Sequence, residues 1–290
     1  MKNSKFGQSV LKSFILGALS LGALGLGTLQ AQAADLNICA GENEMPFSNL
    51  KKEGFENDIA EIIGKALNRK VNYVFWKDAR LVERDYLVKG KCDVMLGVDK
   101  QDAIDPRVKI RKMLKTDTYL KTGYVFITRE DREIDISSWN DALLKEPNFR
   151  IGVMHDSPGK VMLLQINRFD DMFDYFAEKQ KYQSTRNRAI RVDPQEVVND
   201  VATKYIHSAM LWAPEAARYV KESKVPLKMQ VIKDDAKKSN GEPVPMHYEI
   251  VMGVRENDTA LQQDLNRVIK EKRADIEAVL KREGIPLLPI

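Results

Sequence analysis

The sequence predicts an α/β protein of two lobes, each a mainly parallel sheet flanked by helices, with two crossover strands forming the hinge. Strands and helices alternate between residues 35 and 97 and again between residues 149 and 220, which is typical of parallel sheets. Two apolar, β-branched runs, Tyr119–Arg129 and His247–Arg255, indicate one strand that leaves the first lobe and one that returns to it. Two lobes joined in this way leave a cleft, where small molecules bind.

The first 33 residues have the composition of a secretory signal peptide. Lys2, Lys5 and Lys12 form a basic start, Phe14–Leu29 is apolar, and Ala31-Gln-Ala33 is a small-x-small cleavage site. The alternative, an uncleaved membrane anchor, is less favoured because the apolar run is short for a membrane span. We therefore expect cleavage after Ala33 and a soluble mature protein in the periplasm.

Removal of this segment lowers the net charge of the protein. It carries three of the 46 basic residues and none of the 42 acidic ones, so the net charge falls from +4 to +1. The mature chain then lacks the positive field of a nucleic-acid-binding protein. We expect residues 34–127 and 252–290 to form lobe 1 and residues 128–251 to form lobe 2.

Lobe 1 is predicted as strand–helix–strand–helix–strand. Apolar residues at helical spacing support the helices, and Gly90 is typical of a helix C-terminus. Gly64 lies inside the first helix, where glycine costs about 1 kcal/mol relative to alanine, so we expect it to allow close packing on the sheet. The expected elements are a strand over 35–40, a helix entered through 54–58, a strand over 71–76, a helix over 81–89 and a strand over 93–97.

Lobe 2 is predicted from the same signals. Pro158 and Pro214 suit the first turn of a helix, and Ser157 is a candidate N-cap. The expected elements are a short helix over 137–144, a strand over 149–154, a helix over 161–169, a helix over 193–203, a strand over 208–212, a helix over 213–220 and a loop over 233–245. One or two helices within 261–280 are expected to pack back on lobe 1.

The segment 175–191 is polar, with five basic residues and one acidic residue. We interpret it as a solvated excursion from lobe 2. The alternative is a docking patch for a partner protein.

Polar and aromatic side chains follow several predicted strands, at the edge where parallel α/β sheets bind ligands. We expect Arg107 to attract an anion, Ser157 to donate a hydrogen bond from a helix start, and Trp212 to stack on a ligand. The alternatives are ordinary helix capping for Ser157 and a place in the core for the aromatic residues. The residues expected to line the cleft are Glu42, Asn43, Phe47, Asp99, Arg107, Asp156, Ser157 and Trp212.

Cys39 and Cys92 both fall in the strand region of lobe 1. In an oxidising compartment they are expected to form a disulfide, and the alternative is two buried small hydrophobic residues. Two cysteines are too few for a zinc site, and the isolated His155, His207 and His247 lack metal-ligand spacing, so no metal site is expected. Motifs for nucleophilic catalysis, phosphate binding and dinucleotide binding are absent, so no catalytic residue is assigned and no enzyme activity is expected.

The order of the motifs resembles one family over residues 35–290. The motifs are Gly54-Phe-Glu-Asn57 at a helix start, Lys91-Cys-Asp-Val94 at the third strand, Asp105-Pro-Arg107 after it, and Gly123–Arg129 in the crossover. In this order they resemble the type II periplasmic solute-binding protein family. The resemblance implies a fold that closes on its ligand by hinge bending and delivers small solutes to a membrane transporter.

Within that superfamily the chain is similar to the MxaJ (MoxJ) family, periplasmic proteins encoded with bacterial methanol dehydrogenase. Pro46-Phe-Ser-Asn49 and the ending Ile276–Leu288 add to the motifs above. The resemblance implies assembly or maturation of the PQQ- and calcium-dependent methanol dehydrogenase, with that enzyme or its cytochrome as partner. It also implies no cofactor of its own, apart from transient handling of PQQ. XoxJ-type proteins, attached to the lanthanide-dependent enzyme, are the nearest rival.

The resemblance also bears on the ligand. In amino-acid-binding members an arginine after the third strand clamps the ligand carboxylate, and Arg107 matches it in type. Those members hold the ligand's amino group with an aspartate after the late strand of the second lobe, where this chain has Trp212-Ala-Pro214. An ordinary amino acid is therefore not the expected ligand. The alternative functions are a receptor for a small anionic or polar metabolite and an enzyme on this scaffold, which no acid–base pair supports.

Overall fold

A computed structural model describes residues 34–77, 82–101, 113–154, 157–179 and 192–290. The predicted signal peptide and Arg107, Asp156 and His155 lie outside these ranges. Among the described helices, none has the length and apolar character to cross a membrane.

Within the described residues, nine strands form one sheet, in the order β4-β1-β5-β11-β7-β9-β8, with β10 beside β7 and β6 beside β11. The pairs β1–β4, β1–β5 and β8–β9 are parallel. The pairs β5–β11, β11–β7 and β7–β9 are antiparallel. The strands are β1 (Leu36–Gly41), β4 (Val71–Trp76), β5 (Val94–Asp99), β6 (Met113–Lys115), β7 (Leu120–Arg129), β8 (Ile151–Val153), β9 (Ser208–Trp212), β10 (Leu227–Val231) and β11 (His247–Arg255). A separate pair is formed by β2 (Asn43–Glu44) and β3 (Ser48–Asn49).

Strand β7 is buried on both faces, which explains its unbroken apolar run. Phe126 belongs to one core cluster, and its neighbours Val125 and Ile127 belong to another. The two clusters lie on opposite faces because successive side chains of a strand alternate. Strand β7 therefore contributes side chains to two hydrophobic cores, one on each face of the sheet.

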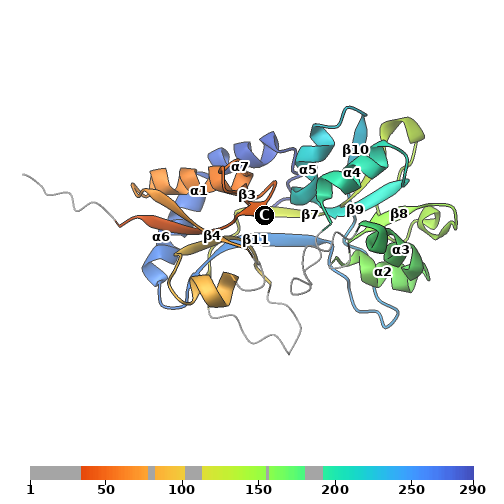
Figure 1. Cartoon of the computed structure of the whole chain (residues 1–290). Helices are drawn as coiled ribbons and strands as arrows, with labels where there is room; N and C mark the ends of the chain where they lie inside the picture. Colours follow the sequence, from red (N-terminus) through yellow and green to blue (C-terminus); the bar gives the residue numbers. More distant parts are fainter. Residues whose placement is uncertain (1–33, 78–81, 102–112, 155–156, 180–191) are drawn as a thin grey trace, which may run out of the picture. The chain divides into compact units, whose positions relative to one another are not determined.

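The helices cover the sheet, with α1 beside α6 and α7 near the β4–β1–β5 end and with α2 beside α3 near β8 (Figure 1). Leu36, Ile59 and Leu280 share one fully buried cluster, which joins a strand, the first helix and the last helix. The helices are α1 (Phe55–Ala66), α2 (Gly159–Gln165), α3 (Phe169–Lys179), α4 (Pro194–Ala202), α5 (Ala213–Lys221), α6 (Thr259–Glu271) and α7 (Arg273–Arg282).

The α/β fold class is confirmed: the sheet has parallel strand pairs at both ends, flanking helices, and two long strands, β7 and β11, between those ends. The prediction for Gly64 is also confirmed, since a Cβ there would lie 2.2 Å from Cγ2 of Val71. The division into lobes at residues 127 and 251 stays a prediction.

Several local predictions are wrong. The helix expected over 81–89 is a short π-helical turn, Glu83–Leu87, and the one expected over 137–144 is a 3₁₀ turn, Ala142–Lys145. The beginning of the expected excursion is instead the end of α3, where Tyr175 is 6 % exposed. Its hydroxyl donates to Asp200 at 2.9 Å, a tertiary contact that overrides the polar local sequence.

Candidate functional site

Three aromatic side chains from three strands form one cluster. Tyr124 on β7 lies opposite Trp212 in the β7–β9 ladder, and Tyr248 comes from β11. Ring centroids are 5.3 Å apart for Tyr124 and Trp212, 5.6 Å for Trp212 and Tyr248, and 6.0 Å for the two tyrosines. All three side chains are half-buried. This aromatic cluster (Tyr124, Trp212, Tyr248) therefore presents ring surface at the end of β9.

Asp99 lies next to this cluster. It ends β5 and pairs with Ile250, two residues after Tyr248 on β11. Burial raises the pKa of Tyr248, and the negative charges of Asp99 and Asp234 raise it further. Two of the predicted site residues, Asp99 and Trp212, are thus brought together through a tyrosine that the sequence analysis did not select.

The carboxyl group of Glu56 faces the backbone of Gly97, which lies two residues before Asp99 on β5. Gly97 has φ +71° and sits in a β-bulge opposite Met252, where a Cβ would meet only the Glu56 carboxyl, with Oε1 at 2.8 Å. The N–H of Gly97 donates to the hydroxyl of buried Tyr119 at 3.1 Å. We call these three residues the carboxyl notch (Glu56, Gly97, Tyr119).

Glu56 has an unusual protonation equilibrium. Burial raises the pKa of its carboxyl to about 7, and its charge adds to the burial that raises the pKa of Tyr119. Within the described ranges no hydrogen bond or ion pair reaches the Glu56 carboxylate. Near neutral pH this group can therefore act either as a donor or as an acceptor toward a bound molecule.

Sequence reasoning missed Glu56 as a site residue. The motif Gly54-Phe-Glu-Asn57 was noted, but a glutamate in the first turn of a helix is ordinarily explained by the helix dipole. Glu56 faces open backbone only because of the bulge at Gly97, where glycine tolerates the positive φ.

The predicted residues of the loop after β1 have separate roles. Glu42 is half-buried, with Nζ of Lys77 3.9 Å from its Oε1, and Asn43 is exposed in β2. The ring of Phe47 packs on Phe55 at 5.1 Å between centroids, so this side chain supports the start of α1. Their part in ligand binding stays a prediction.

The capping prediction for Ser157 is wrong. Helix α2 begins at Gly159, Pro158 occupies the N-cap position, and no side chain caps the helix. The Ser157 hydroxyl instead donates to the carbonyl of Met154 at 2.6 Å and is nearly buried. Its proton closes a local turn, and its part in ligand binding stays a prediction.

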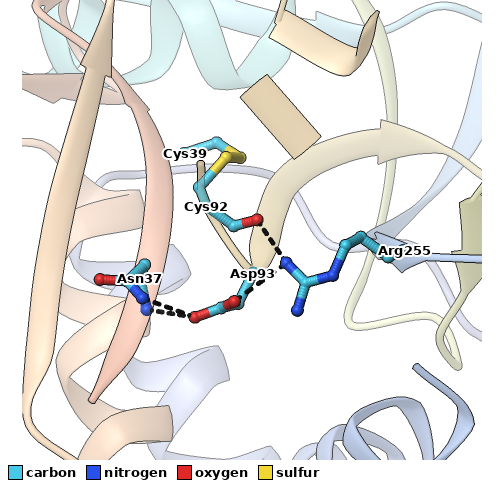
Figure 2. The surroundings of a disulfide bond; sticks show 5 residues. All are labelled: Asn37, Cys39, Cys92, Asp93 and Arg255. Carbon is cyan, nitrogen blue, oxygen red and sulfur yellow. Dashed lines mark hydrogen bonds and ion pairs between the residues drawn. A yellow bond between two sulfur atoms is a disulfide. The ribbon is translucent and has the colours of Figure 1, made fainter. Parts of the chain in front are cut away.

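Cys39 and Cys92 form a disulfide between β1 and the segment that immediately precedes β5 (Figure 2). Beside it, the Asp93 carboxylate accepts two hydrogen bonds from Asn37 at 2.9 Å each and forms an ion pair with Arg255 at 3.0 Å. Arg255 also donates to the carbonyl of Cys92 at 2.8 Å. Together these contacts join β1, β5 and β11 at the edge away from the strand ends just described.

The described histidines have structural partners. Nδ1 of His207 accepts from the N–H of Arg150 at 3.0 Å, and burial followed by the nearby Arg132 and Arg150 charges lowers its pKa. His247 donates from Nε2 to the carbonyl of Ile232 at 2.8 Å. Over the part of the chain that the structure describes, no group of three or more His, Cys, Asp or Glu side chains could hold a metal ion.

Comparison with known proteins gives consistent relatives. Residues 36–282 match the sequence model of the bacterial extracellular solute-binding proteins, family 3. Protein MoxJ of Methylorubrum extorquens is 37% identical over 259 residues, which cover 89% of this chain and 83% of that protein. Protein MoxJ of Paracoccus denitrificans is 32% identical over 260 residues, 89% of this chain and 91% of that one.

Two solved structures are similar to this chain over most of its length. The crystal structure of MxaJ from Methlophaga aminisulfidivorans MPT has a TM-score of 0.79 and 37% sequence identity, covering 87% of this chain and 100% of that one. Periplasmic binding protein XoxJ from Methylobacterium extorquens AM1 has a TM-score of 0.62 and 27% identity, with 88% and 100% covered.

Proposed function

Because the chain belongs to the bacterial extracellular solute-binding proteins of family 3, we propose that it is a periplasmic accessory protein of methanol oxidation. It assists assembly or maturation of a PQQ-dependent methanol dehydrogenase by binding, not by catalysis. The observation that carries this proposal is the likeness to MoxJ and MxaJ at 37% identity over most of the chain. In this function the dehydrogenase or its cytochrome is the partner, and the protein has no cofactor of its own.

The aromatic cluster supports this function over amino-acid binding. The end of β9 carries the indole of Trp212, and the rings of Tyr124 and Tyr248 lie within 6.0 Å of each other. Half-buried aromatic surface favours contact with an apolar segment of a partner or with a planar aromatic group. PQQ is a planar aromatic carboxylate, so transient handling of PQQ is part of the proposal.

The first test is native mass spectrometry of the mature protein mixed with methanol dehydrogenase that was purified without it. We expect a discrete complex that Trp212→Ala weakens. Tyr205→Ala is the control, because Tyr205 is an aromatic residue that is 39 % exposed and lies outside the aromatic cluster. A mixture that contains only the separate proteins, together with normal assembly of the dehydrogenase in a strain that lacks this chain, would contradict the proposal.

The carboxyl notch favours a second candidate, a receptor that delivers a small polar or anionic metabolite to a membrane transporter. Glu56 has no partner within the described ranges and stands beside the exposed Gly97, so a polar ligand group can reach it. Calorimetric titration with metabolites of the periplasm tests this function. Saturable binding that Glu56→Gln abolishes, with no complex with the dehydrogenase, would favour the receptor.

A further inference from the structure

Helix α5 is bonded to the segment before α1 and to the end of α7, two helices near the β4–β1–β5 end of the sheet (Figure 1). It follows β9 directly, so Trp212 is both the last residue of β9 and the N-cap residue of α5. Helix α5 lies within residues 128–251, predicted as lobe 2, whereas α1 and α7 lie within the ranges predicted as lobe 1. These bonds therefore connect the two lobes in addition to the crossover strands β7 and β11.

The main bond is a buried ion pair. Nε of Arg218 donates to Oε2 of Glu283 at 2.6 Å, and the two side chains are only 18% and 6% exposed. The other carboxylate oxygen of Glu283 is 3.4 Å from Nη2 of Arg282, which also pairs with Asp58 of α1. Buried pairs are screened less by salt than exposed ones, and loss of one partner leaves an unpaired charge in the interior. The pair must therefore break before α5 can leave α7.

Backbone carbonyls complete the contact. Nη1 and Nη2 of Arg218 each lie 3.3 Å from the carbonyl oxygen of Glu53, just before α1. Nζ of Lys221 donates to the carbonyl of Arg282 at 2.6 Å, at the end of α7, where carbonyl groups lack helical partners. Gly284 then turns the chain away with φ +84°, a conformation that glycine permits. The last turn of α5 thus holds both the start of α1 and the end of α7.

The apolar attachment of α5 to lobe 1 is small by comparison. Of the α5 side chains, only that of Ala217 belongs to the core cluster of α1 and α7. Ala213 and Ala216 face the other way, into the cluster that contains Val125 of β7. One buried methyl group contributes little to the hydrophobic stabilisation. The polar bonds therefore account for most of the attachment of α5 to lobe 1.

We propose that the Arg218–Glu283 pair is a latch between the two lobes. While the pair is formed, α5 and its N-cap residue Trp212 stay against lobe 1, and the aromatic cluster keeps the geometry described above. When the pair breaks, lobe 2 rotates about β7 and β11, and the ring of Trp212 moves relative to the core of lobe 1. The proposal concerns the motion of the fold and does not rest on the proposed function.

The test compares the mature protein, its disulfide intact, with Glu283→Gln, with Arg218→Gln and with the double variant. Glutamine nearly keeps the volume of glutamate and removes its charge. Glu277→Gln is the matched control, because Glu277 lies on the same helix and pairs at 3.1 Å with Lys281, also of α7. The double variant leaves neither member of the latch as an unpaired charge, so it gives the result if a single variant does not fold.

Two measurements report on the latch. Spin labels on Lys65→Cys in α1 and Lys145→Cys in lobe 2, both exposed positions, give the distance between the lobes by double electron–electron resonance. Fluorine NMR of protein labelled with 5-fluorotryptophan reports on the surroundings of Trp212. Trp139, which is buried in the core around Phe126, is the internal reference.

We expect one narrow distance distribution in the mature protein and in Glu277→Gln, and a broader or longer one in Glu283→Gln and Arg218→Gln. The Trp212 signal should shift in the same two variants, while the Trp139 signal stays in place. Because Arg218 and Glu283 form one contact, the double variant should move the distance no further than the larger single change. An unchanged distance in all three variants, additive changes, an equal change in Glu277→Gln, or a fixed Trp212 signal in an opened variant would each overturn the proposal.

Discussion

Replacement of Glu56 by glutamine should make the protein more stable at alkaline pH. In the folded state burial raises the pKa of this carboxyl from its ordinary 4.5 to about 7. The folded state therefore holds the proton more tightly than the unfolded chain, and ionisation favours unfolding. A pKa difference of this size corresponds to about 3 kcal/mol, which the partial exposure of the side chain reduces to about 2–3 kcal/mol.

The sign gives a definite pH window. Below pH 4.5 both states hold the proton, so the carboxyl costs no stability. Between pH 4.5 and about pH 7 the free energy of unfolding should fall as the pH rises, and above about pH 7 the full cost remains. Glutamine cannot ionise, so Glu56→Gln should remove this loss and nothing else.

Urea denaturation at a series of pH values from 4 to 8.5 measures the effect, with the disulfide kept intact. We expect Glu56→Gln to match the wild type near pH 4.5 and to exceed it by about 2–3 kcal/mol at pH 8. The control is Glu61→Gln, an exposed glutamate of the same helix that accepts a hydrogen bond from Tyr73 at 2.9 Å, and it should not reproduce the gain in stability of Glu56→Gln at pH 8. If the wild type and Glu56→Gln kept parallel curves, the Glu56 carboxyl would not be desolvated as the structure places it.

Three further predictions concern stability. Replacing Cys39 and Cys92 by serine opens a loop of 53 residues, so the free energy of unfolding should fall by about 4 kcal/mol in denaturant titrations; no loss would contradict a closed loop in the native protein. Gly64→Ala should destabilise by about 1–3 kcal/mol because its Cβ would lie 2.2 Å from Val71 Cγ2, and the additional change Val71→Ala should recover most of the loss in thermal unfolding. Asp193→Ala removes the side-chain cap of α4 and should cost about 1 kcal/mol, whereas Asp193→Asn should cost little.

Much of the fold could be predicted because the central strands have continuous apolar sequences that predict a buried strand. The run of β7 is apolar on both faces, and β9 was predicted with its observed bounds, Ser208–Trp212. Strand β10, Leu227–Val231, was missed because lysine and glutamine interrupt its apolar residues and all five side chains are only half-buried. Its position depends on pairing with Thr128 and its neighbours on β7, which lie about a hundred residues earlier, and local sequence does not encode that partner.

The candidate site was harder to predict than the fold. Asp99 and Trp212 could be selected from the rule that ligands bind at strand ends, and in the structure Trp212 packs on Tyr248 and the charge of Asp99 acts on Tyr248. Tyr124 and Tyr248 were inside predicted strands, where aromatic residues are usually core. Their joint position depends on the register of β7 with β9 and β11, so it emerges only when the strands pair. Arg107 and Asp156 remain predictions, since both lie outside the described residues.

Trp212 at the end of β9 is uncharged and also contributes apolar contacts. Trp212 packs on the core cluster that contains α1 and α7, whereas its partner Tyr124 packs on the cluster around Phe126 and Trp139. The cluster therefore links two cores through the strands that run between the two ends of the sheet. A ligand or partner that inserts between Trp212 and Tyr248 must separate rings that already contact each other. Only a group with comparable apolar surface would replace those contacts, which favours an aromatic group or a nonpolar protein segment over a small hydrated solute.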